Sequence, residues 1–384
     1  MSDTVDIIIG ADILPMSSNA ELFSSCEPAD LVGSELSDIL SDADFRVFNL
    51  EGPLTDKKNP LLKSGPILSA PEKTIHGIKK LQPDLLALSN NHILDHDQIG
   101  VDRTISLLQQ NNIAYIGIGK TDMERRKSFL FEKNGIKVGV YNCCEHEFSV
   151  RKEGGWGAAP YDPLVSFDDV RELKEQCDFA VVLYHGGKEY FRYPSPRLQK
   201  VFRKFAASGA DAVFAQHTHC IGSAEVFNGS LLFYGQGNFL FDIGSSEFLD
   251  TGLLVKLRFS RGKAMQFEYI PVCRNGNRTR LAAAAEKENI LHALEARSMH
   301  LSDTEFIQNE YQKKAAEYLR GYLLNMHAGT KLDTVFIRLF LKMPGRIQRR
   351  FFPRTLEHLL ATRNYVQCQA HRELLLAGLA DFMV

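Results

Sequence analysis

Two histidines separated by one residue are the strongest chemical signal in this sequence. His217 and His219 flank Thr218 and directly follow the apolar run Ala212–Ala215. In an extended backbone, residues i and i+2 point to the same side, so both imidazoles can bind one metal ion or two adjacent ions. The pattern therefore predicts a metal site.

Four more groups of polar residues occur in the same kind of place, directly after a short apolar run. They are Asp12, Asn49 with Glu51, Asn90–His92, and His185. Each group alone has an ordinary explanation as a turn, a loop or a core histidine. Ligands of α/β proteins bind beyond the carboxyl ends of strands, so five coincident groups favour one shared site. Imidazole and carboxylate ligands suit Zn²⁺, Mn²⁺ or Fe ions better than ions that prefer thiolates.

The loop after His185 adds residues that can meet a negatively charged substrate. Lys188, Arg192 and Tyr193 follow within eight positions. They are candidate substrate-binding residues, and the alternative is an ordinary polar loop.

Alternating strand and helix patterns must position these residues. Runs that read as buried strands lie at Val5–Ile9, Phe45–Asn49, Leu85–Leu88, Ile113–Ile116, Phe179–Tyr184 and Ala212–Ala215. Segments with helical periodicity lie between them, at Leu31–Leu40, Pro71–Leu81, Val101–Gln110, Val170–Gln176 and Arg197–Ala207. This alternation predicts an α/β core.

Hairpin signals show that the sheet is mixed. Asn134-Gly135 and Asn228-Gly229 each separate two apolar runs, and Asn-Gly favours a type I′ turn. Two further strands are expected at Gly252–Phe259 and Met265–Ile270. The predicted class is therefore α/β with antiparallel (α+β) pieces.

The composition changes after residue 275, and the rest of the chain reads as successive helices. We expect one domain at residues 1–275 and an α-helical region at 276–384, with Asp303 as a helix cap. Within this region, residues 334–354 hold six basic and no acidic residues, interleaved with phenylalanines. Such a segment suits contact with a membrane surface or with polymer-synthesis machinery. The alternative is a solvated helix whose aromatic residues pack on the first domain.

Bulk properties limit the class of protein. The 384 residues carry a formal net charge of −2, so no nucleic-acid partner is expected. Seven cysteines without a CxxC pair indicate a reducing compartment. The sequence has neither a signal-peptide pattern nor an apolar run of membrane-spanning length. The expected location is the cytoplasm, with peripheral contact at the inner face of the membrane as an extension of this prediction.

The motifs together resemble the bacterial capsule synthesis proteins of the CapA, or poly-γ-glutamate synthesis, type. These are a branch of the calcineurin-like metallophosphoesterases. The resemblance covers roughly residues 5–258 and is carried by GAD (10–12), NLEGP (49–53), NNHILDHDQIG (90–100), HGGKEY (185–190), SGADAVFAQHTH (208–219) and YGQGNFLFD (234–242). It implies mixed β-sheet layers flanked by helices.

The resemblance also implies roles for individual residues. Two divalent metal ions (Mn, Fe or Zn) would be held by Asp12, Glu51, Asn91, His185, His217 and His219. Glu51 takes the bridging position, His92 resembles the catalytic imidazole near the leaving group, and Asn238 lines the site as a substrate-binding residue. Asp95 or Asp97 would orient His92, and Asp95 is the preferred candidate. Leu14 departs from the superfamily pattern, because a histidine ligand often stands at its position.

Three functions are compatible with these residues. The first is metal-assisted hydrolysis of a phosphomonoester or phosphodiester, in which bound cations activate water and stabilise phosphoryl charge. The second is hydrolysis of an amide or ester in a γ-glutamyl polymer at the same site. The third is a non-catalytic assembly or export factor for polymer synthesis, which the gap at Leu14 favours. The substrate in the first two would be an anionic small molecule or polymer.

Overall fold

The computed structural model describes residues 4–25, 27–150, 154–242, 244–325 and 356–382. The chain forms two compact units. The first contains Met1–Leu61 and Ile67–Ile307, and the second contains Leu62–Pro66 and Gln308–Val384. The basic segment predicted at 334–354 lies outside the described residues.

The first unit contains an eight-stranded mixed sheet. Its order is β16-β15-β14-β1-β2-β3-β4, and β13 pairs with β1 at the end of that strand. The strands are β1 (Thr4–Leu14), β2 (Phe45–Leu50), β3 (Leu85–Ala87), β4 (Ala114–Ile116), β13 (Asn238–Phe241), β14 (Thr251–Ser260), β15 (Gln266–Asn275) and β16 (Arg278–Leu281). Strands β1 to β4 run parallel, so their carboxyl ends share one edge of the sheet.

A second sheet has six strands in the order β11-β12-β10-β9-β7-β6. These are β6 (Phe129–Lys133), β7 (Ile136–Cys144), β9 (Phe179–His185), β10 (Ala212–Gln216), β11 (Ala224–Phe227) and β12 (Ser230–Phe233). Strands β7, β9, β10 and β12 are parallel neighbours. The short strands β5 (Ile118–Gly119) and β8 (Gly157–Ala158) form a separate pair.

Both predicted hairpins are confirmed. Asn134 and Gly135 join β6 to β7 with φ of 54° and 72°, and Asn228 and Gly229 join β11 to β12 with φ of 50° and 86°. Positive φ at both central residues is the requirement of a type I′ turn, and Asn-Gly meets it at low steric cost.

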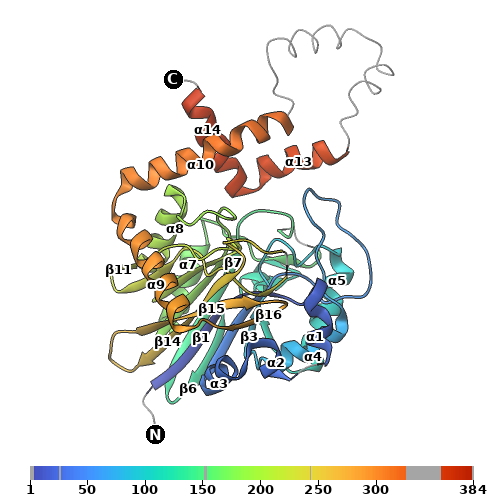
Figure 1. Ribbon diagram of the computed structural model, residues 1–384, viewed down its shortest axis with the longest axis vertical. Coiled ribbons are helices and arrows are strands. Elements are labelled where there is room, and N and C mark those ends of the chain that lie inside the picture. The colour runs from blue at the N-terminus through green and yellow to red at the C-terminus, as the bar shows by residue number, and fades with distance from the viewer. Residues whose placement is uncertain (1–3, 26, 151–153, 243, 326–355, 383–384) are drawn as a thin grey trace. The chain divides into compact units, whose positions relative to one another are not determined.

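The two sheets pack face to face, and helices cover their outer faces. In β1, Ile7 and Ile9 belong to the apolar cluster between the sheets, whereas Ile8 belongs to the cluster on the outer face. This alternation follows from the two-residue repeat of a strand. Figure 1 shows α1–α5 along one flank of the sheets and α7 and α8 on the other. The layers agree with the mixed sheets and flanking helices expected from the sequence.

The helices of these layers have the following bounds. They are η1 (Ser17–Asn19), α1 (Ala20–Ser25), α2 (Pro28–Val32), α3 (Ser34–Asp42), η2 (Glu72–Thr74), α4 (Ile75–Lys80), α5 (Asp97–Gln110), α6 (Asp122–Arg126), α7 (Ser166–Gln176) and α8 (Pro196–Ala207). The helix expected at Leu31–Leu40 is divided, because Gly33 adopts a φ of 75° and ends α2 before α3 begins.

The first unit extends beyond the boundary expected near residue 276. Strand β16 pairs with β15, and α9 (Ala284–Ser298) places Leu294 in the core between the sheets. Arg297 also donates hydrogen bonds to the carbonyl groups of Ile221 and Gly222. Residues 278–281 are therefore a strand rather than helix, and the division between the units falls after Ile307.

The second unit is helical within its described residues. It contains most of α10 (Thr304–Asn325), together with α13 (Leu356–Gln367) and α14 (Gln369–Phe382). Tyr322 and His371 are joined by a 2.8 Å hydrogen bond between the phenol oxygen and Nδ1. Asp303, immediately after η3 (Met299–Ser302), accepts a hydrogen bond from the Phe306 amide and caps α10 as predicted. None of the helices in the described parts of the chain is long and apolar enough to cross a membrane.

Candidate metal centre

The ends of five strands bring the predicted residues together. Asp12 lies in β1, Glu51 follows β2, and Asn91 follows β3 by a short turn. From the facing sheet, β9 ends at His185, and β10 is followed by His217 and His219. Since all of these strands end at one side of the two sheets, residues far apart in the chain become neighbours.

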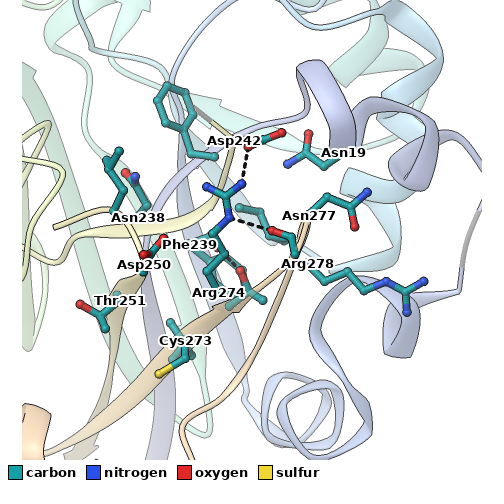
Figure 2. Close-up of a pocket in the computed structure, with 17 residues that line it drawn as sticks. Asn19, Asn238, Phe239, Asp242, Asp250, Thr251, Cys273, Arg274, Asn277 and Arg278 are labelled. Carbon is teal, nitrogen blue, oxygen red and sulfur yellow. Dashed lines mark hydrogen bonds and ion pairs between the residues drawn. The ribbon is translucent and has the colours of Figure 1, made fainter. Parts of the chain in front are cut away.

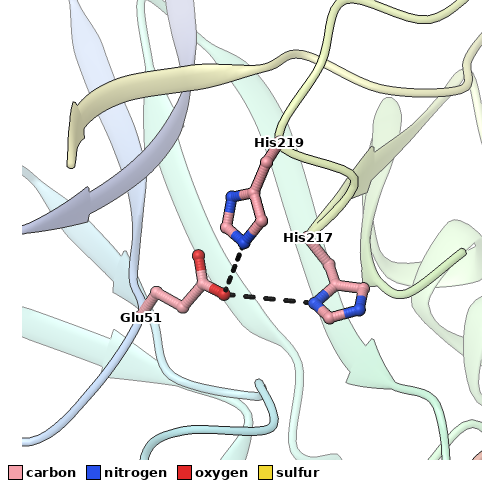
Figure 3. Close-up of side chains that lie close together, drawn as sticks. All are labelled: Glu51, His217 and His219. Carbon is pink, nitrogen blue, oxygen red and sulfur yellow. Dashed lines mark ion pairs between the residues drawn. The ribbon is translucent and has the colours of Figure 1, made fainter. Parts of the chain in front are cut away.

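Glu51 is the centre of this group. Its Oε1 lies 3.6 Å from Nε2 of His185, 3.7 Å from Nε2 of His219 and 4.0 Å from Nδ1 of His217. Figure 3 shows the carboxylate facing the two imidazoles of His217 and His219. The ligand atoms of Glu51, His217 and His219 all lie within 4.8 Å of one another. Three imidazole nitrogens therefore converge on one carboxylate oxygen.

Asp12 joins the group on the side of His219. Its Oδ2 lies 3.8 Å from Nδ1 of His219 and accepts a 3.1 Å hydrogen bond from the backbone amide of His217. The side chain of Asn49 donates to Oδ1 at 2.8 Å. Asp12 is thus fixed in place while it faces the imidazoles.

Asn91 lies against His185. The amide oxygen Oδ1 of Asn91 is 3.1 Å from Nε2 of His185, which is the nitrogen that also faces Glu51. Nδ1 on the other side of the ring lies 3.3 Å from the Asn49 amide nitrogen. The two predicted ligands Asn91 and His185 are therefore presented together.

Burial determines the charges in this group. It raises the pKa of Glu51 well above the usual value, and the adjacent Asp12 carboxylate raises it further. Burial likewise raises the pKa of Asp12, against an opposing effect of His219. For His217, burial lowers the pKa to about 3, although the Glu189 carboxylate acts in the opposite direction. Burial and the neighbouring imidazoles lower the pKa of His185 well below 6.5. Both histidines are therefore neutral, the form that binds metal ions.

Several polar atoms here are buried without a hydrogen-bond partner among the described residues. They include both carboxylate oxygens of Glu51, Nδ1 of His217 and the amide nitrogen of Asn238. A buried polar atom without a partner costs about 1–3 kcal/mol, and more when it is charged. A divalent cation offsets the repulsion of two carboxylates and accepts the lone pairs of neutral imidazoles. The donor set therefore fits a metal ion.

His92 and Asp95 form a pair beside the cluster. Nδ1 of His92 lies 2.6 Å from Oδ2 of Asp95, and the Leu68 amide donates to the same oxygen at 2.7 Å. Of the two candidates for orienting His92, the structure brings Asp95 into contact with it. Asp97 instead begins α5.

The predicted substrate-binding residues lie in three different settings. Arg192 is 3.8 Å from Glu247 and its guanidinium stacks on the Phe248 ring at 4.8 Å. Lys188 is partly buried, and its charge helps to lower the pKa of His217. Tyr193 packs on the edge of Phe306 and joins the apolar cluster behind the second sheet. Of these three, only Lys188 has an electrostatic effect on a histidine of the cluster among the interactions described.

Asn238 contacts the cluster directly. Its Oδ1 lies 2.8 Å from Nδ1 of His219, which leaves Nε2 of that histidine facing Glu51. A cavity of about 20 Å³ adjoins Asn238 and is lined by Asn19, Asp242, Cys273 and Arg274 (Figure 2). Asp242 and Arg274 pair across it at 2.7 Å. The space suits roughly one water molecule rather than a substrate.

Two residues of this region were not predicted as site residues. Asn49 connects Asp12, His185 and Asn90 through its amide group, and Glu189 places Oε1 3.9 Å from Nε2 of His217. The sequence contained a signal for both, because Asn49 ends a strand and Glu189 lies in HGGKEY. Asn90, from the group after β3, had no predicted role of its own, and it is buried and accepts from the amides of His92 and Ile93.

Leu14 is buried in the apolar cluster on the outer face of the first sheet. A side chain at this position points into that cluster rather than toward Asp12. A leucine suits this apolar surrounding.

Two capsule-synthesis proteins are similar in sequence to about 70% of this chain. The chain is 27% identical over 275 residues to the PGA biosynthesis protein CapA of Bacillus subtilis, covering 70% of this chain and 72% of that protein. It is also 27% identical over 275 residues to the capsule biosynthesis protein CapA of Bacillus anthracis, covering 69% and 67% respectively.

Similar solved structures are more distant. A hypothetical protein from Thermus thermophilus aligns with 71% of this chain and 100% of its own, at 15% identity and a TM-score of 0.46. A 5'-nucleotidase precursor from the same organism aligns with 78% of this chain and 60% of its own, at 13% identity and a TM-score of 0.39.

The sequence of the first unit also matches a protein family over most of its length. The matched residues are 6–243, which include every ligand candidate from Asp12 to His219 and also Asn238. The chain therefore belongs to the bacterial capsule synthesis protein family PGA_cap.

Proposed function

We propose that the protein is a metal-dependent hydrolase of phosphoesters that acts in the synthesis of a capsule or another anionic polymer. The observation that carries this proposal is the setting of Glu51. Its carboxylate is buried without a hydrogen-bond partner among the described residues, and nitrogens of three imidazoles lie within 4.0 Å of one oxygen. Natural proteins rarely leave buried polar atoms unpaired unless a ligand or a reaction uses them.

Six side chains would hold two divalent cations. They are Asp12, Glu51, Asn91, His185, His217 and His219. Bound divalent cations lower the pKa of water and stabilise negative charge on a phosphoryl group. This chemistry needs neutral imidazoles, and burial keeps His185 and His217 neutral.

His92 would act as the general acid that protonates the leaving group. In its protonated form, His92 would donate Nδ1–H to Asp95, which fixes the ring and leaves Nε2–H to give its proton to the departing oxygen. The hydrogen bond from the Leu68 amide holds Asp95 in turn. Lys188 supplies positive charge near His217, which favours an anionic substrate, and Arg192 would add to it from the same loop.

The test is hydrolysis of bis-p-nitrophenyl phosphate and p-nitrophenyl phosphate by the metal-depleted protein after addition of Mn²⁺. We expect turnover that depends on the metal and falls about 10²- to 10⁴-fold in His92→Ala. Thermal unfolding of both proteins verifies that the variant is folded. Equal rates for wild type and His92→Ala would reject the proposal for these substrates.

A second candidate reaction uses the same residues on a different bond. The related Bacillus subtilis protein is named for PGA biosynthesis, which favours an amide or ester of a γ-glutamyl polymer as the target. Incubation with such a polymer, followed by analysis of chain length, separates the two reactions. Shortened chains without phosphoesterase activity would favour this candidate.

Metal content separates both hydrolases from an assembly factor without catalysis. A hydrolase binds divalent metal in the wild type and loses it in the double variant His217→Ala, His219→Ala. A wild-type protein that takes up no Mn²⁺, Fe²⁺ or Zn²⁺ would favour the assembly factor.

A further inference from the structure

Glu189 is a charged residue of the candidate metal centre that the roles proposed above do not use. Its Oε1 lies 3.9 Å from Nε2 of His217, and its side chain is 38% exposed. On the opposite side of the same ring, Nδ1 of His217 faces Oε1 of Glu51 at 4.0 Å and is buried without a hydrogen-bond partner among the described residues. His217 is therefore placed between two carboxylates, one at each nitrogen.

The backbone fixes Glu189 in this position. The amide of Gly186 donates to the Gln216 carbonyl at 3.1 Å, and the amide of Tyr190 donates to the Thr218 carbonyl at 2.9 Å. These two hydrogen bonds attach both ends of the segment 186–190 to the backbone of residues 216–218, on either side of His217. Glu189 thus lies over His217 because the main chain holds it there.

Two unusual conformations accompany this attachment. Gly187 has a φ of 101°, and a Cβ atom there would lie 3.2 Å from Cγ2 of Thr218. Tyr190 has a φ of 58°, which is uncommon for a residue with a large side chain. The conformation of Tyr190 costs about 1–3 kcal/mol and persists where surrounding contacts enforce it, whereas glycine adopts a positive φ at little cost. The contacts here enforce the approach of Glu189 to His217.

The chemistry of metal-binding histidines explains what this approach achieves. An imidazole that ligates a metal through one nitrogen usually donates its other N–H to a carboxylate or carbonyl group. That bond fixes the tautomer and the ring orientation, and makes the ligating nitrogen more basic. In this cluster, Asn238 already has that relation to His219, because its Oδ1 lies 2.8 Å from Nδ1 of His219.

We propose that Glu189 is the positioning residue of His217. It accepts a hydrogen bond from Nε2–H, so that Nδ1 is the nitrogen presented to the metal beside Glu51. A small movement of the partly exposed carboxylate shortens the 3.9 Å separation to hydrogen-bond length. The inference rests on the metal site of the proposed function but not on the reaction catalysed there.

The test measures metal affinity instead of turnover. Full-length wild type, Glu189→Gln and Glu189→Leu are stripped of metal and titrated with Zn²⁺ against a chromophoric chelator. Leucine removes the acceptor, and we expect a roughly 10- to 100-fold weaker affinity. Glutamine keeps a neutral acceptor oxygen of similar reach, so its affinity should lie between those of wild type and Glu189→Leu. Glu172→Leu, an exposed carboxylate on α7, controls for the loss of one negative charge.

A second measurement separates positioning from a structural role. Thermal unfolding of the metal-free proteins should give the same midpoint for wild type and both Glu189 variants, because His217 needs orientation only when it binds metal. The absorption spectrum of Co²⁺ bound at the site should change in Glu189→Leu and be largely restored in Glu189→Gln.

Three results would overturn the inference. They are an affinity of Glu189→Leu within twofold of wild type, equal losses in the Gln and Leu variants, and a lower metal-free midpoint that accounts for the lost affinity. Equal losses would make Glu189 a ligand in its own right. A wild type that binds metal without hydrolysing any substrate would reject the proposed reaction and leave this inference intact.

Discussion

Two groups of charged and polar side chains within the first unit differ in how their atoms are paired. Around Glu225, two nitrogens of Arg203 donate to the two carboxylate oxygens at 3.0 and 2.7 Å, and the Tyr234 hydroxyl donates to Oε1 at 2.7 Å. Around Glu51, both carboxylate oxygens are buried, yet neither has a hydrogen-bond partner in the described part of the chain. Both groups contain a glutamate at the centre, but among the described residues only the first has its carboxylate fully paired.

This difference distinguishes a network that stabilises the fold from a group of residues that fits a metal site. Arg203 also donates to the Leu301 carbonyl, so the Glu225 network ties α8 and β11 to the segment after α9. A completed network of this kind stabilises the fold, and removing one partner leaves a charge without compensation. An incomplete network destabilises the protein until a ligand completes it. Replacing a member of the Glu51 group should therefore weaken metal binding without lowering the stability of the metal-free protein. Replacing a member of the Glu225 network should lower stability without weakening metal binding.

The largest effect is expected for Glu51→Gln. The amide removes the negative charge at the point where three imidazoles converge, so metal affinity should fall by more than about 100-fold, beyond the loss typical of residues that only orient a ligand. The metal-free variant should unfold at the same temperature as wild type or higher, because a buried repulsion with Asp12 is removed. Chelator competition and thermal unfolding give both quantities. Glu35→Gln, on the exposed face of α3, is the charge-matched control. A large loss of metal-free stability would show that Glu51 is structural.

An intermediate effect is expected for Arg203→Met, which breaks the complete network. Glu225 would keep only the Tyr234 hydroxyl among its described partners, and its side chain is just 14% exposed. We expect the free energy of unfolding to fall by about 2 kcal/mol, less than for a fully buried pair because Arg203 is partly solvated. Urea unfolding measures this loss. Arg171→Met, from the exposed pair with Asp168, should cost less than about 0.5 kcal/mol. Metal affinity reduced together with stability would contradict the separation of the two networks.

The sequence predicted the Glu51 group better than the Glu225 network. Apolar runs followed by polar residues are local patterns, and all five groups at strand ends lie where that pattern indicates. Arg203 and Glu225 meet across 22 positions from a helix and a strand, so nothing local distinguishes them from surface charges. The approach of Glu189 to His217 likewise depends on backbone hydrogen bonds between separate segments. The domain limit near residue 276 was placed by composition, whereas the packing of α9 into the core extends the first unit.

The smallest expected effect is the change in the free energy of unfolding per pH unit. We expect it for the Glu51 group and not for the Glu225 network. Burial and Asp12 raise the folded-state pKa of Glu51 above its usual value of 4.5. A group whose pKa is raised by folding binds its proton more tightly in the folded protein, so its contribution to stability is complete below about pH 4.5 and is lost as pH rises through the folded-state value. The amide introduced by Glu51→Gln imitates the protonated carboxyl group at every pH. The metal-free wild type and Glu51→Gln should therefore have similar stability near pH 4.5.

As the pH rises above that value, the variant should become more stable than wild type by at most about 1.4 kcal/mol per pH unit. Urea unfolding of both metal-free proteins from about pH 4 to about pH 8 measures the difference. Saturating Zn²⁺ should reverse its sign, because only the wild type binds the ion tightly and ligand binding to the folded state adds to its stability. Arg203→Met should show no such reversal, since the oxygens of Glu225 are already paired with Arg203 and Tyr234 in the wild type. A difference between wild type and Glu51→Gln that stays constant over this range would mean that folding leaves the Glu51 carboxylate unperturbed, and Glu51 would then resemble Glu225 rather than the centre of a metal site.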